Sequence, residues 1–389
     1  MLDEARQRCA TLQATLRARD IPLAVFSDES SIAYLAGFWG YLGVEFGRPT
    51  LLLVPADGAP VAITPLMESE MAATMTWVDD IRSWEDAGPN GWPQVLGAAL
   101  HDHLGETPAK LWVERAQIPA PLRNWLGDHF PDTILSDIGP VLGTQRMIKS
   151  PAEIAVMRQA GHIAGAMMRA AHESLAEGVP EYESALAVVE AGTRAAAGFL
   201  TDRGRERFVS PMIHNLQIMQ SGADTSMVHR RTSVRRYRRG DPVYFCFCNM
   251  AQFRQYKLGF DRMFHIGAVS DGAARVQQAA IDAQQAAIAA MRPGVTAEDV
   301  AAAADAVYAA RGHATGYRTG RSIGMAYLEA PELKPGDTTV LQPGMTFAVD
   351  GGISVEGVTA GRIGDSVVVT EAGCDYLTDY PREIMVTDG

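Results

Sequence analysis

The stretch MIKSPAEIAVMRQA, residues 147–160, marks the point at which the chain changes character. Ser150 has the side chain of a helix N-cap, Pro151 suits the first helical position, and Glu153 places a carboxylate in the first turn, where cap and helix dipole both favour it. The pattern predicts a long helix that begins at Pro151 and opens a second domain. We therefore predict a domain boundary after residue 145.

The first predicted domain, residues 1–145, alternates short apolar runs with helical patterns. The runs predict strands because they are brief and rich in aliphatic residues, and the longer amphipathic segments predict helices. This alternation is typical of a small α/β domain. The predicted strands are PLAVFS (22–27), PTLLLVP (49–55), PVAIT (60–64) and AKLWVE (109–114), and two predicted helices are PQVLGAALHDHL (93–104) and PLRNWLGDHF (121–130).

The second predicted domain, residues 146–389, shows the order helix, helix, strands twice. This repeated order predicts an α+β domain with an internal pseudo-twofold arrangement. The first two predicted helices cover residues 151–175 and 181–198 and are followed by strands up to Gly267, and the next two, rich in alanine, lie around 276–291 and 297–310.

The composition predicts a folded protein that does not bind nucleic acid. Hydrophobic residues make up 47% of the 389 residues, enough for a large core, and 46 acidic against 34 basic residues give a net charge of -12. Such a surface repels nucleic acid and anionic membranes. The basic run HRRTSVRRYRR, residues 229–239, is an exception, which we interpret as a solvated turn or a salt-bridge surface between subunits.

The first residues and the cysteines indicate the compartment. The segment MLDEARQRCATLQ is charged from its third residue and lacks the apolar region of a signal peptide, and no stretch approaches the ~18 apolar residues that a membrane span needs. We therefore expect a cytoplasmic protein. The four cysteines should stay reduced there, and their spacing matches neither a disulfide framework nor a zinc motif.

Two of these cysteines lie in VYFCFCNMAQFRQYKLGFDRMFHIG, residues 243–267, which predicts two strands joined by a polar turn. Side chains in a strand alternate between faces, so Cys246 and Cys248 point the same way. Two thiols on one face are compatible with a reactive site, a metal site or packing. The alternation alone does not choose among these three.

Three segments carry a family resemblance. MIKSPAEIAVMRQA, QPGMTFAVDGG (342–352) and GRIGDSVVVTEAG (361–373) are similar to the corresponding segments of the creatinase, prolidase and aminopeptidase P superfamily. The resemblance implies a C-terminal pita-bread domain that carries the active site, preceded by a smaller α/β domain of the creatinase N-terminal, ribonuclease H-like type. It also implies a homodimer.

The metal-binding members of this family hold two ions with five side chains, and the resemblance shows where those ligands fall here. Only one of the five matched positions keeps a carboxylate, Asp350. Hard divalent ions need several oxygen or imidazole ligands, and an arginine adds a charge that never deprotonates. We therefore expect no metal and no cofactor. The five matched positions are Cys248, Gly259, Arg321, Asp350 and Gly364.

The metal-independent branch of the family gives a different prediction for the active site, one without metal. The segment QSGADTSMVH, residues 220–229, resembles the creatinase stretch whose histidine serves as acid and base, and the match falls on His229. Imidazole titrates near neutrality, as that chemistry requires. The matched glutamate partner falls on Asp261, which would raise the pKa of the imidazole and orient a cation. The ordinary alternatives are a surface histidine and a strand-end salt bridge between Asp261 and Arg262.

The N-terminal domain supplies a further match. In the segment YLAGFWGYLGVEFGRPT, residues 34–50, the resemblance falls on Phe46 and Arg48. In creatinase this arginine enters the neighbouring subunit's site and binds the substrate carboxylate, a task that suits the planar guanidinium. Phe46 would cover the substrate. The alternative for Arg48 is an ordinary exposed arginine.

Cys248 has two possible roles. One metal-free member of the family carries a catalytic glutamate at the matched position, and a thiolate there would be a nucleophile if Arg321 or His229 lowered its pKa. Cysteines in strands are more often small buried apolar residues. We expect packing or pocket lining for both Cys246 and Cys248, with the nucleophile as the open alternative.

The sequence thus favours a metal-independent, creatinase-like hydrolase that cleaves a carbon-nitrogen bond of a small zwitterionic or carboxylate-bearing, creatine- or ectoine-like metabolite. His229 is the expected acid and base. Asp261 and Asp350 would position cationic groups and water, Arg48 and Arg321 would bind anionic groups, and Glu329 is a weaker candidate for substrate binding. The alternatives are an Xaa-Pro metallopeptidase, a non-catalytic binding protein of the same fold, and a lyase.

Overall fold

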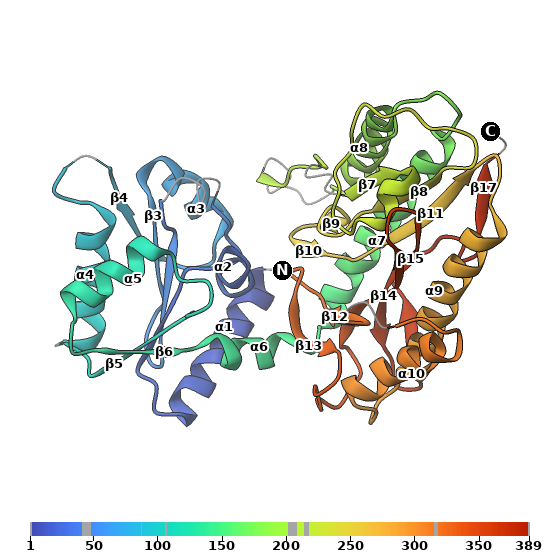
Figure 1. The fold of residues 1–389 in the computed structure, drawn as a ribbon. Helices are drawn as coiled ribbons and strands as arrows, with labels where there is room; N and C mark the ends of the chain where they lie inside the picture. The colour runs from blue at the N-terminus through green and yellow to red at the C-terminus, as the bar shows by residue number, and fades with distance from the viewer. Residues whose placement is uncertain are drawn as a thin grey trace. The chain divides into compact units, whose positions relative to one another are not determined.

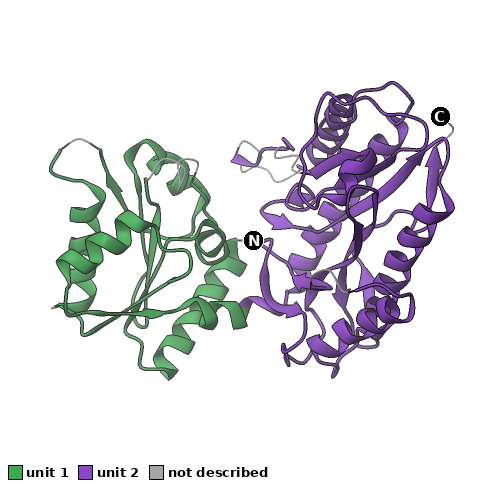
Figure 2. Ribbon diagram, viewed as in Figure 1, with its two compact units in different colours: residues 1–145 green, residues 146–389 purple. Residues whose placement is uncertain are grey.

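The computed structural model describes residues 2–40, 48–86, 88–105, 107–200, 208–213, 218–314 and 318–387. The chain divides into two compact units, residues 1–145 and 146–389, which Figure 2 colours separately. Among the described helices, none combines the length and the apolar character that a membrane span requires.

The first unit contains a six-stranded sheet in the order β4-β3-β2-β1-β5-β6 (Figure 1). β1 pairs antiparallel with β2 and parallel with β5, so the sheet is mixed. Leucines of α4 and α5, among them Leu96 and Leu122, pack with Val25 and Leu53 of the sheet into one core. The bounds are α1 Leu2–Ala18, β1 Leu23–Phe26, α2 Glu29–Ala36, β2 Leu51–Pro55, β3 Val61–Pro65, α3 Ser69–Met75, β4 Asp80–Trp84, α4 Trp92–Leu104, β5 Lys110–Val113, α5 Ala120–His129, β6 Ile134–Asp137 and α6 Gly139–Arg146.

The second unit is built on one large sheet whose main path runs β13-β12-β14-β15-β11-β8-β7, with β16 beside β15 and β17 beside β11. Two helix pairs, α7 with α8 and α9 with α10, accompany it (Figure 1). The bounds are α7 Pro151–Glu173, α8 Glu181–Gly198, β7 Ile218–Ser221, β8 Pro242–Cys246, β9 Gln252–Phe253, β10 Tyr256–Lys257, β11 Asp261–Ile266, α9 Asp271–Ala290, α10 Ala297–Ala310, β12 Gly320–Ser322, β13 Glu329–Leu333, β14 Thr346–Val355, β15 Thr359–Val369, β16 Cys374–Tyr376 and β17 Met385–Thr387. The predicted order of two helices followed by strands, repeated once, is present.

Local sequence explains where the long helices begin. Ser150 Oγ accepts a hydrogen bond from the amide of Glu153 at 3.2 Å, and the Glu153 carboxylate accepts one from the amide of Ser150 at 2.8 Å. Thr296 and Asp299 form the same capping box at the start of α10. Each box satisfies amides that the first helical turn leaves without an intrahelical partner, which fixes the helix start.

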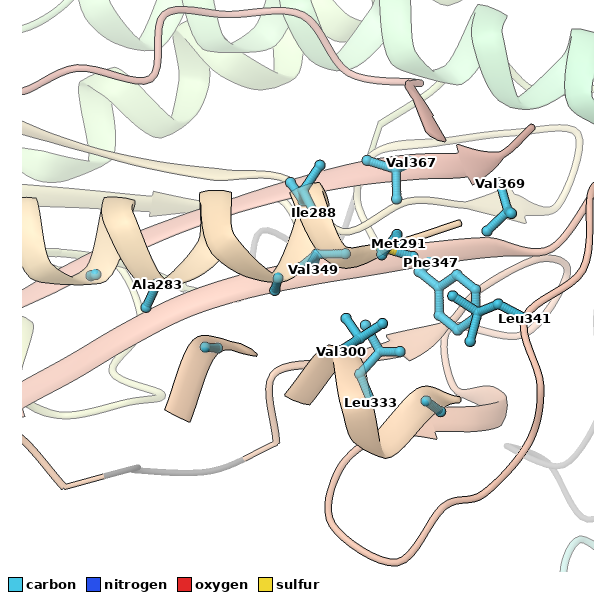
Figure 3. Packing of buried hydrophobic residues seen from close by; sticks show 14 of the residues in the cluster. Ala283, Ile288, Met291, Val300, Leu333, Leu341, Phe347, Val349, Val367 and Val369 are labelled. Carbon is cyan, nitrogen blue, oxygen red and sulfur yellow. The ribbon is translucent and has the colours of Figure 1, made fainter. Parts of the chain in front are cut away.

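The core of the second unit lies between α9, α10 and the sheet. Figure 3 shows Phe347 and Val349 of β14 and Val367 of β15 packed with Ile288 of α9. The helix approaches closely because Gly351 has no side chain; a Cβ there would lie 2.1 Å from the carbonyl oxygen of Ala280. Since strand residues alternate between faces, the even-numbered residues of β14 and β15 point away from this core.

The segment that carries the two cysteines differs in one respect from the expected pair of strands. β8 ends at Cys246, and Cys248 lies in the turn that follows. Asn249 ends the extended run because it adopts a φ of 65°, a left-handed conformation that asparagine tolerates. Before β11 begins, the chain makes a small ribbon of β9 and β10, which the sequence did not predict.

Candidate active site

The strand register of the second unit brings the predicted site residues together. On β15, Gly364 lies directly opposite Asp261 of β11 on one side and directly opposite Asp350 of β14 on the other. Arg321 of β12 lies opposite Ala348 of β14. Three neighbouring strands therefore place two aspartates on either side of a glycine, on one face of the sheet.

Arg321 connects two of the predicted residues. Its side chain is buried; Nη1 donates to Oδ2 of Asp350 at 2.6 Å, and Nη2 donates to Sγ of Cys248 at 3.5 Å. The ring of Tyr327 lies against the guanidinium, 4.2 Å from its carbon to the ring centroid, which is the geometry of a cation-π contact. We name Arg321, Asp350, Cys248, Cys246 and Asp261 the Arg321 cluster.

The thiols and Asp261 form the other half of the Arg321 cluster. One donor atom from each of Cys246, Cys248 and Asp261 lies within 4.8 Å of the others. A hydrogen bond from the thiol of Cys246 and the charge of Arg321 lower the pKa of Cys248, and the same hydrogen bond raises the pKa of Cys246. Burial and the neighbouring Asp350 raise the pKa of Asp261 well above its usual range. The surroundings of Asp261 therefore oppose its ionisation, whereas the sequence led us to expect an anionic partner for His229.

Several polar atoms of the Arg321 cluster have no protein partner. Among the described residues, Oδ1 of Asp261, Oδ1 of Asp350 and Nε of Arg321 are buried and make no hydrogen bond. Arg262, the expected salt-bridge partner of Asp261, instead directs its guanidinium to the carboxylate of Asp365 and to backbone carbonyls. Buried polar groups without partners are rare in folded proteins and are a common feature of ligand sites.

The two-metal arrangement of the family does not fit these residues. A Cβ on Gly259 would lie 2.5 Å from Cβ of Ala348 and 3.1 Å from Nη2 of Arg321. A Cβ on Gly364 would lie 2.2 Å from a carboxylate oxygen of Asp261. The guanidinium and the Asp261 carboxyl group therefore fill the space that two ligand side chains would need, and the guanidinium brings a repelling charge.

His229 lies apart from these contacts. It is exposed, in the segment that follows the 3-10 turn Gly222–Ser226, and the preceding Val228 carbonyl accepts a hydrogen bond from Gln220 at 3.4 Å. In the described part of the chain, no hydrogen bond or ion pair joins His229 to the Arg321 cluster. The predicted contact between His229 and Asp261 is thus not made directly.

Two arginines of the basic run 229–239 form ion pairs with carboxylates that lie outside the run. The carboxylate of Glu181 accepts hydrogen bonds from Arg230 at 2.6 Å, Ser221 at 2.6 Å and Ser233 at 2.7 Å. Burial opposes ionisation of Glu181, but these hydrogen bonds outweigh it and lower its pKa. Arg235 pairs in the same way with Asp241 at 2.6 Å. These contacts anchor the chain at Ser221, before His229, and at Arg230 and Arg235, after it.

Glu329 belongs to a buried ion-pair group. Its carboxylate accepts hydrogen bonds from Arg146 at 2.5 Å, from Lys149 at 2.9 Å and from the amide of Ala326 at 3.1 Å. Burial opposes ionisation, but the two cations lower the pKa of Glu329 to about 2. Both carboxylate oxygens are engaged, so we do not include this predicted candidate among the proposed substrate contacts.

The first unit contains two of the predicted substrate-binding residues, Arg48 and Phe46. Arg48 forms an ion pair with Asp86, in which Nε donates to Oδ1 at 3.2 Å, and its side chain is 33% exposed, so it remains accessible. Phe46 lies outside the described residues.

Sequence reasoning missed the contact of Tyr327 with Arg321 and the close approach of the Asp261 carboxyl group to Gly364. Neither contact has a signal in local sequence.

These features define a two-domain protein of the creatinase and aminopeptidase fold, with a polar cluster in place of the metal ligands of its C-terminal sheet. Residues 155–371 match metallopeptidase family M24, and residues 8–148 match the creatinase/prolidase N-terminal domain. The chain belongs to the M24 family, and its relatives include creatinase, ectoine hydrolase and dipeptidases, so it is a member of a hydrolase superfamily.

Individual relatives match over nearly their whole length. Agropine synthesis cyclase of Rhizobium rhizogenes is 31% identical, with 97% of this chain and 96% of the relative covered. Ectoine hydrolase of Halomonas elongata is 25% identical over 99% of this chain and 97% of its own length. The crystal structure of dipeptidase PepE from Mycobacterium ulcerans matches with a TM-score of 0.82 and 28% identity, covering 99% of this chain and 98% of that one.

Proposed function

We propose that the protein is a metal-independent hydrolase that cleaves a carbon-nitrogen bond in a small zwitterionic or carboxylate-bearing metabolite. The observation that carries this proposal is the Arg321 guanidinium, which pairs with Asp350 and, together with the side chain of Ala348, crowds the position of a metal-ligand side chain at Gly259. The similarity to ectoine hydrolase and creatinase, whose names describe action on small metabolites, supports it further.

Each proposed role follows from charge and position. Arg321 keeps its positive charge at every pH of interest, so it would bind a carboxylate or stabilise negative charge that develops on a carbonyl oxygen. Asp261, whose pKa is raised by burial and by Asp350, would hydrogen-bond to the substrate in the same region, and Asp350 holds Arg321 in place. His229, which is exposed, would move the proton between water and the leaving nitrogen once a substrate spans the distance from the Arg321 cluster to the imidazole.

The test uses protein treated with EDTA and a set of small substrates that includes ectoine, creatine and amides of amino acids. Mass spectrometry should detect a product that has gained one water, with a rate unaffected by EDTA. His229→Gln should lower kcat by ~10²- to 10⁴-fold, the usual range for general acid-base catalysis. His101→Gln, an exposed histidine of α4, is the control and should keep full activity. Turnover that appears only after adding Mn²⁺ or Co²⁺ would instead establish a metallopeptidase.

A second candidate is an intramolecular cyclisation. The 31% identity with agropine synthesis cyclase over nearly the whole of both chains favours it specifically. Hydrolysis and cyclisation both direct a nucleophile at a carbon that bears a leaving group, and they differ in whether water or a group of the substrate attacks. The same mass measurement separates them, because a cyclised product gains no water, and loses one when water is the leaving group.

We also propose a homodimer in which Arg48 serves the neighbouring subunit's site. The support is the resemblance of the segment around Arg48 to creatinase and the match of residues 8–148 to the creatinase-type domain. Mixing inactive Arg48→Ala subunits with inactive His229→Ala subunits should restore activity, since each heterodimer contains one intact composite site. Absence of recovery despite demonstrated subunit exchange would exclude this role for Arg48.

A further inference from the structure

Three potential metal ligands converge in the Arg321 cluster although their spacing in sequence gives no zinc motif. Asp261 lies directly opposite Cys246 in the antiparallel pair of β11 and β8, and Cys248 follows two residues later. Sulfur atoms of both cysteines and a carboxylate oxygen of Asp261 all lie within 4.8 Å of one another. Among the described residues, this is the one group of three such side chains.

A second observation points to a ligand at the same place. Oδ1 of Asp261 makes no hydrogen bond, although the residue is only 4% exposed. A buried carboxylate oxygen that lacks a donor is costly for the folded protein, and a cation is one of the partners that removes that cost.

We propose that Cys246, Cys248 and Asp261 form a binding site for one thiophilic divalent cation of the Zn²⁺ or Cd²⁺ kind. Two sulfur donors and one oxygen donor favour such ions over Mg²⁺, Ca²⁺ and Mn²⁺, which prefer oxygen. The site differs from the two-metal arrangement of the family, with which it shares only the position of Cys248.

The geometry needs only a small adjustment to close around an ion. With bonds of ~2.0–2.3 Å, a tetrahedral ion holds its ligand atoms about 3.3–3.8 Å apart, so side-chain rotations that shorten the longest separation by about 1 Å suffice. Cys248 is half-buried, so the site borders solvent there and water can supply a fourth ligand. The guanidinium of Arg321, 3.5 Å from the Cys248 sulfur, offsets the negative charge that two thiolates and a carboxylate retain around a divalent ion.

An ion at this site would inhibit the proposed hydrolase, and this consequence rests on the proposed function. Binding takes the carboxyl group of Asp261 away from the substrate and engages the Cys248 sulfur with the ion. The protein would then be active without metal and inactivated by thiophilic metals, the opposite of a metallopeptidase.

The binding test requires no substrate. The reduced full-length protein is freed of metal with EDTA, desalted and titrated with CdCl₂, while the ultraviolet charge-transfer absorption of cadmium-thiolate bonds is recorded. We expect saturation at one Cd²⁺ per chain, displacement by Zn²⁺ and no competition from Mg²⁺. Absence of the absorption in the folded wild-type protein would overturn the proposal.

Single substitutions assign the ligands. Cys246→Ser and Cys248→Ser should each lose about half of the absorption or more, because one of two thiolates is removed, and Asp261→Asn should keep the absorption but bind Cd²⁺ more weakly. Cys374→Ser is the matched control, since this half-buried thiol lies outside the cluster, and it should titrate like the wild type. Unchanged absorption in both the Cys246 and Cys248 variants would refute the site.

Alkylation of the wild-type protein tests the site without any substitution, so it applies even when a variant does not fold. In the wild-type protein, Zn²⁺ should protect Cys248 from iodoacetamide and leave the rate at Cys374 unchanged, as measured by peptide mass spectrometry. Equal rates at Cys248 with and without Zn²⁺ would contradict the proposal. If Cd²⁺ binds as described but no substrate is ever hydrolysed, the proposed function fails and the metal site stands.

Discussion

Among the described residues, the large sheet of the second unit carries two buried arginine-aspartate pairs, Arg262 with Asp365 and Arg321 with Asp350, at N···O distances of 2.9 and 2.6 Å. They lie on opposite faces, because Asp365 points with the odd-numbered residues of β15 toward α9, where Gln284 donates to it at 3.0 Å. Asp350 points the other way, with Gly364. The two pairs are alike in burial and differ in how completely their atoms are bonded.

The pair on the α9 side is saturated. Arg262 donates to Asp365 and to four backbone carbonyl oxygens, and Asp365 also accepts hydrogen bonds from Thr378 and Arg382. The pair on the other side leaves Nε of Arg321 and Oδ1 of Asp350 without a partner. A saturated buried pair holds a fold together, whereas an unsaturated pair keeps bonding capacity for a ligand. The comparison therefore separates a structural cluster from a functional one.

The largest expected difference is between the two aspartates. Asp365→Asn leaves the buried Arg262 without a counter-ion and should lower the free energy of unfolding by ~3–5 kcal/mol, the usual cost of breaking a buried pair. Asp350→Asn should cost ~1–3 kcal/mol, since Asp350 accepts from Arg321, whereas Asp365 accepts from four side chains. Urea denaturation of both variants measures the difference. Equal losses would mean that the Arg321 pair is as structural as the other.

Glu329 forms a third buried ion-pair group, with Arg146 and Lys149. Both of its carboxylate oxygens are bonded, so it should behave like the saturated pair of Arg262 and Asp365. Its pKa is lowered from about 4.5 to about 2. Because the folded-state pKa is the lower one, the stabilisation is present above pH ~4.5 and is lost as the pH falls toward ~2. Glu329→Gln should lower the free energy of unfolding by ~3 kcal/mol at pH 7, and the gap to the wild type should close in acid. A gap that does not change between pH 7 and pH 3 would contradict the assignment.

Substitution of Gly364 tests how tightly the carboxyl groups of Asp261 and Asp350 pack against this glycine. An added Cβ would lie 2.2 Å from Asp261 and 2.9 Å from Asp350, so Gly364→Ala should cost ~1–3 kcal/mol through overpacking. Gly373→Ala is the control, because a Cβ there has no neighbour within 4 Å. Thermal unfolding of the two variants gives the comparison. A Gly364→Ala protein as stable as the control would show that the Asp261 carboxyl group moves freely.

The smallest expected effect concerns the aromatic rings beside the two arginines. Phe260 lies against Arg262 at 4.8 Å and Tyr327 against Arg321 at 4.2 Å. Phe260 is fully buried, so Phe260→Leu should cost ~1–2 kcal/mol of stability, while Tyr327→Leu, at a half-buried position, should cost only ~0.5–1 kcal/mol. Urea denaturation of both variants measures the two losses of stability. A larger loss for Tyr327→Leu would indicate that the Arg321 cluster is also a stability element.

The sequence by itself determined the elements and the family. Helices 181–198 and 297–310 occupy the predicted residues, and the Ser150 cap forms the predicted helix start, because capping and helical periodicity act between residues only a few positions apart. The resemblance of three motifs gave the two-domain fold that the comparisons confirm. The residues at the five positions matched to the family's metal ligands also indicated that all but one of these ligands are replaced.

Only the tertiary structure decided what those positions form. Asp261 meets Cys246 and Gly364 because β11 pairs with both β8 and β15, and Gly364 lies more than 100 residues along the chain from Asp261. The same pairing buries Asp261 beside Asp350, which raises the pKa of Asp261, and the fold elsewhere brings Glu329 to Arg146 and Lys149. Burial, register and charge pairing arise between segments far apart in sequence. Local patterns therefore carry no signal for them, and the chemistry of this site became visible only in the folded sheet.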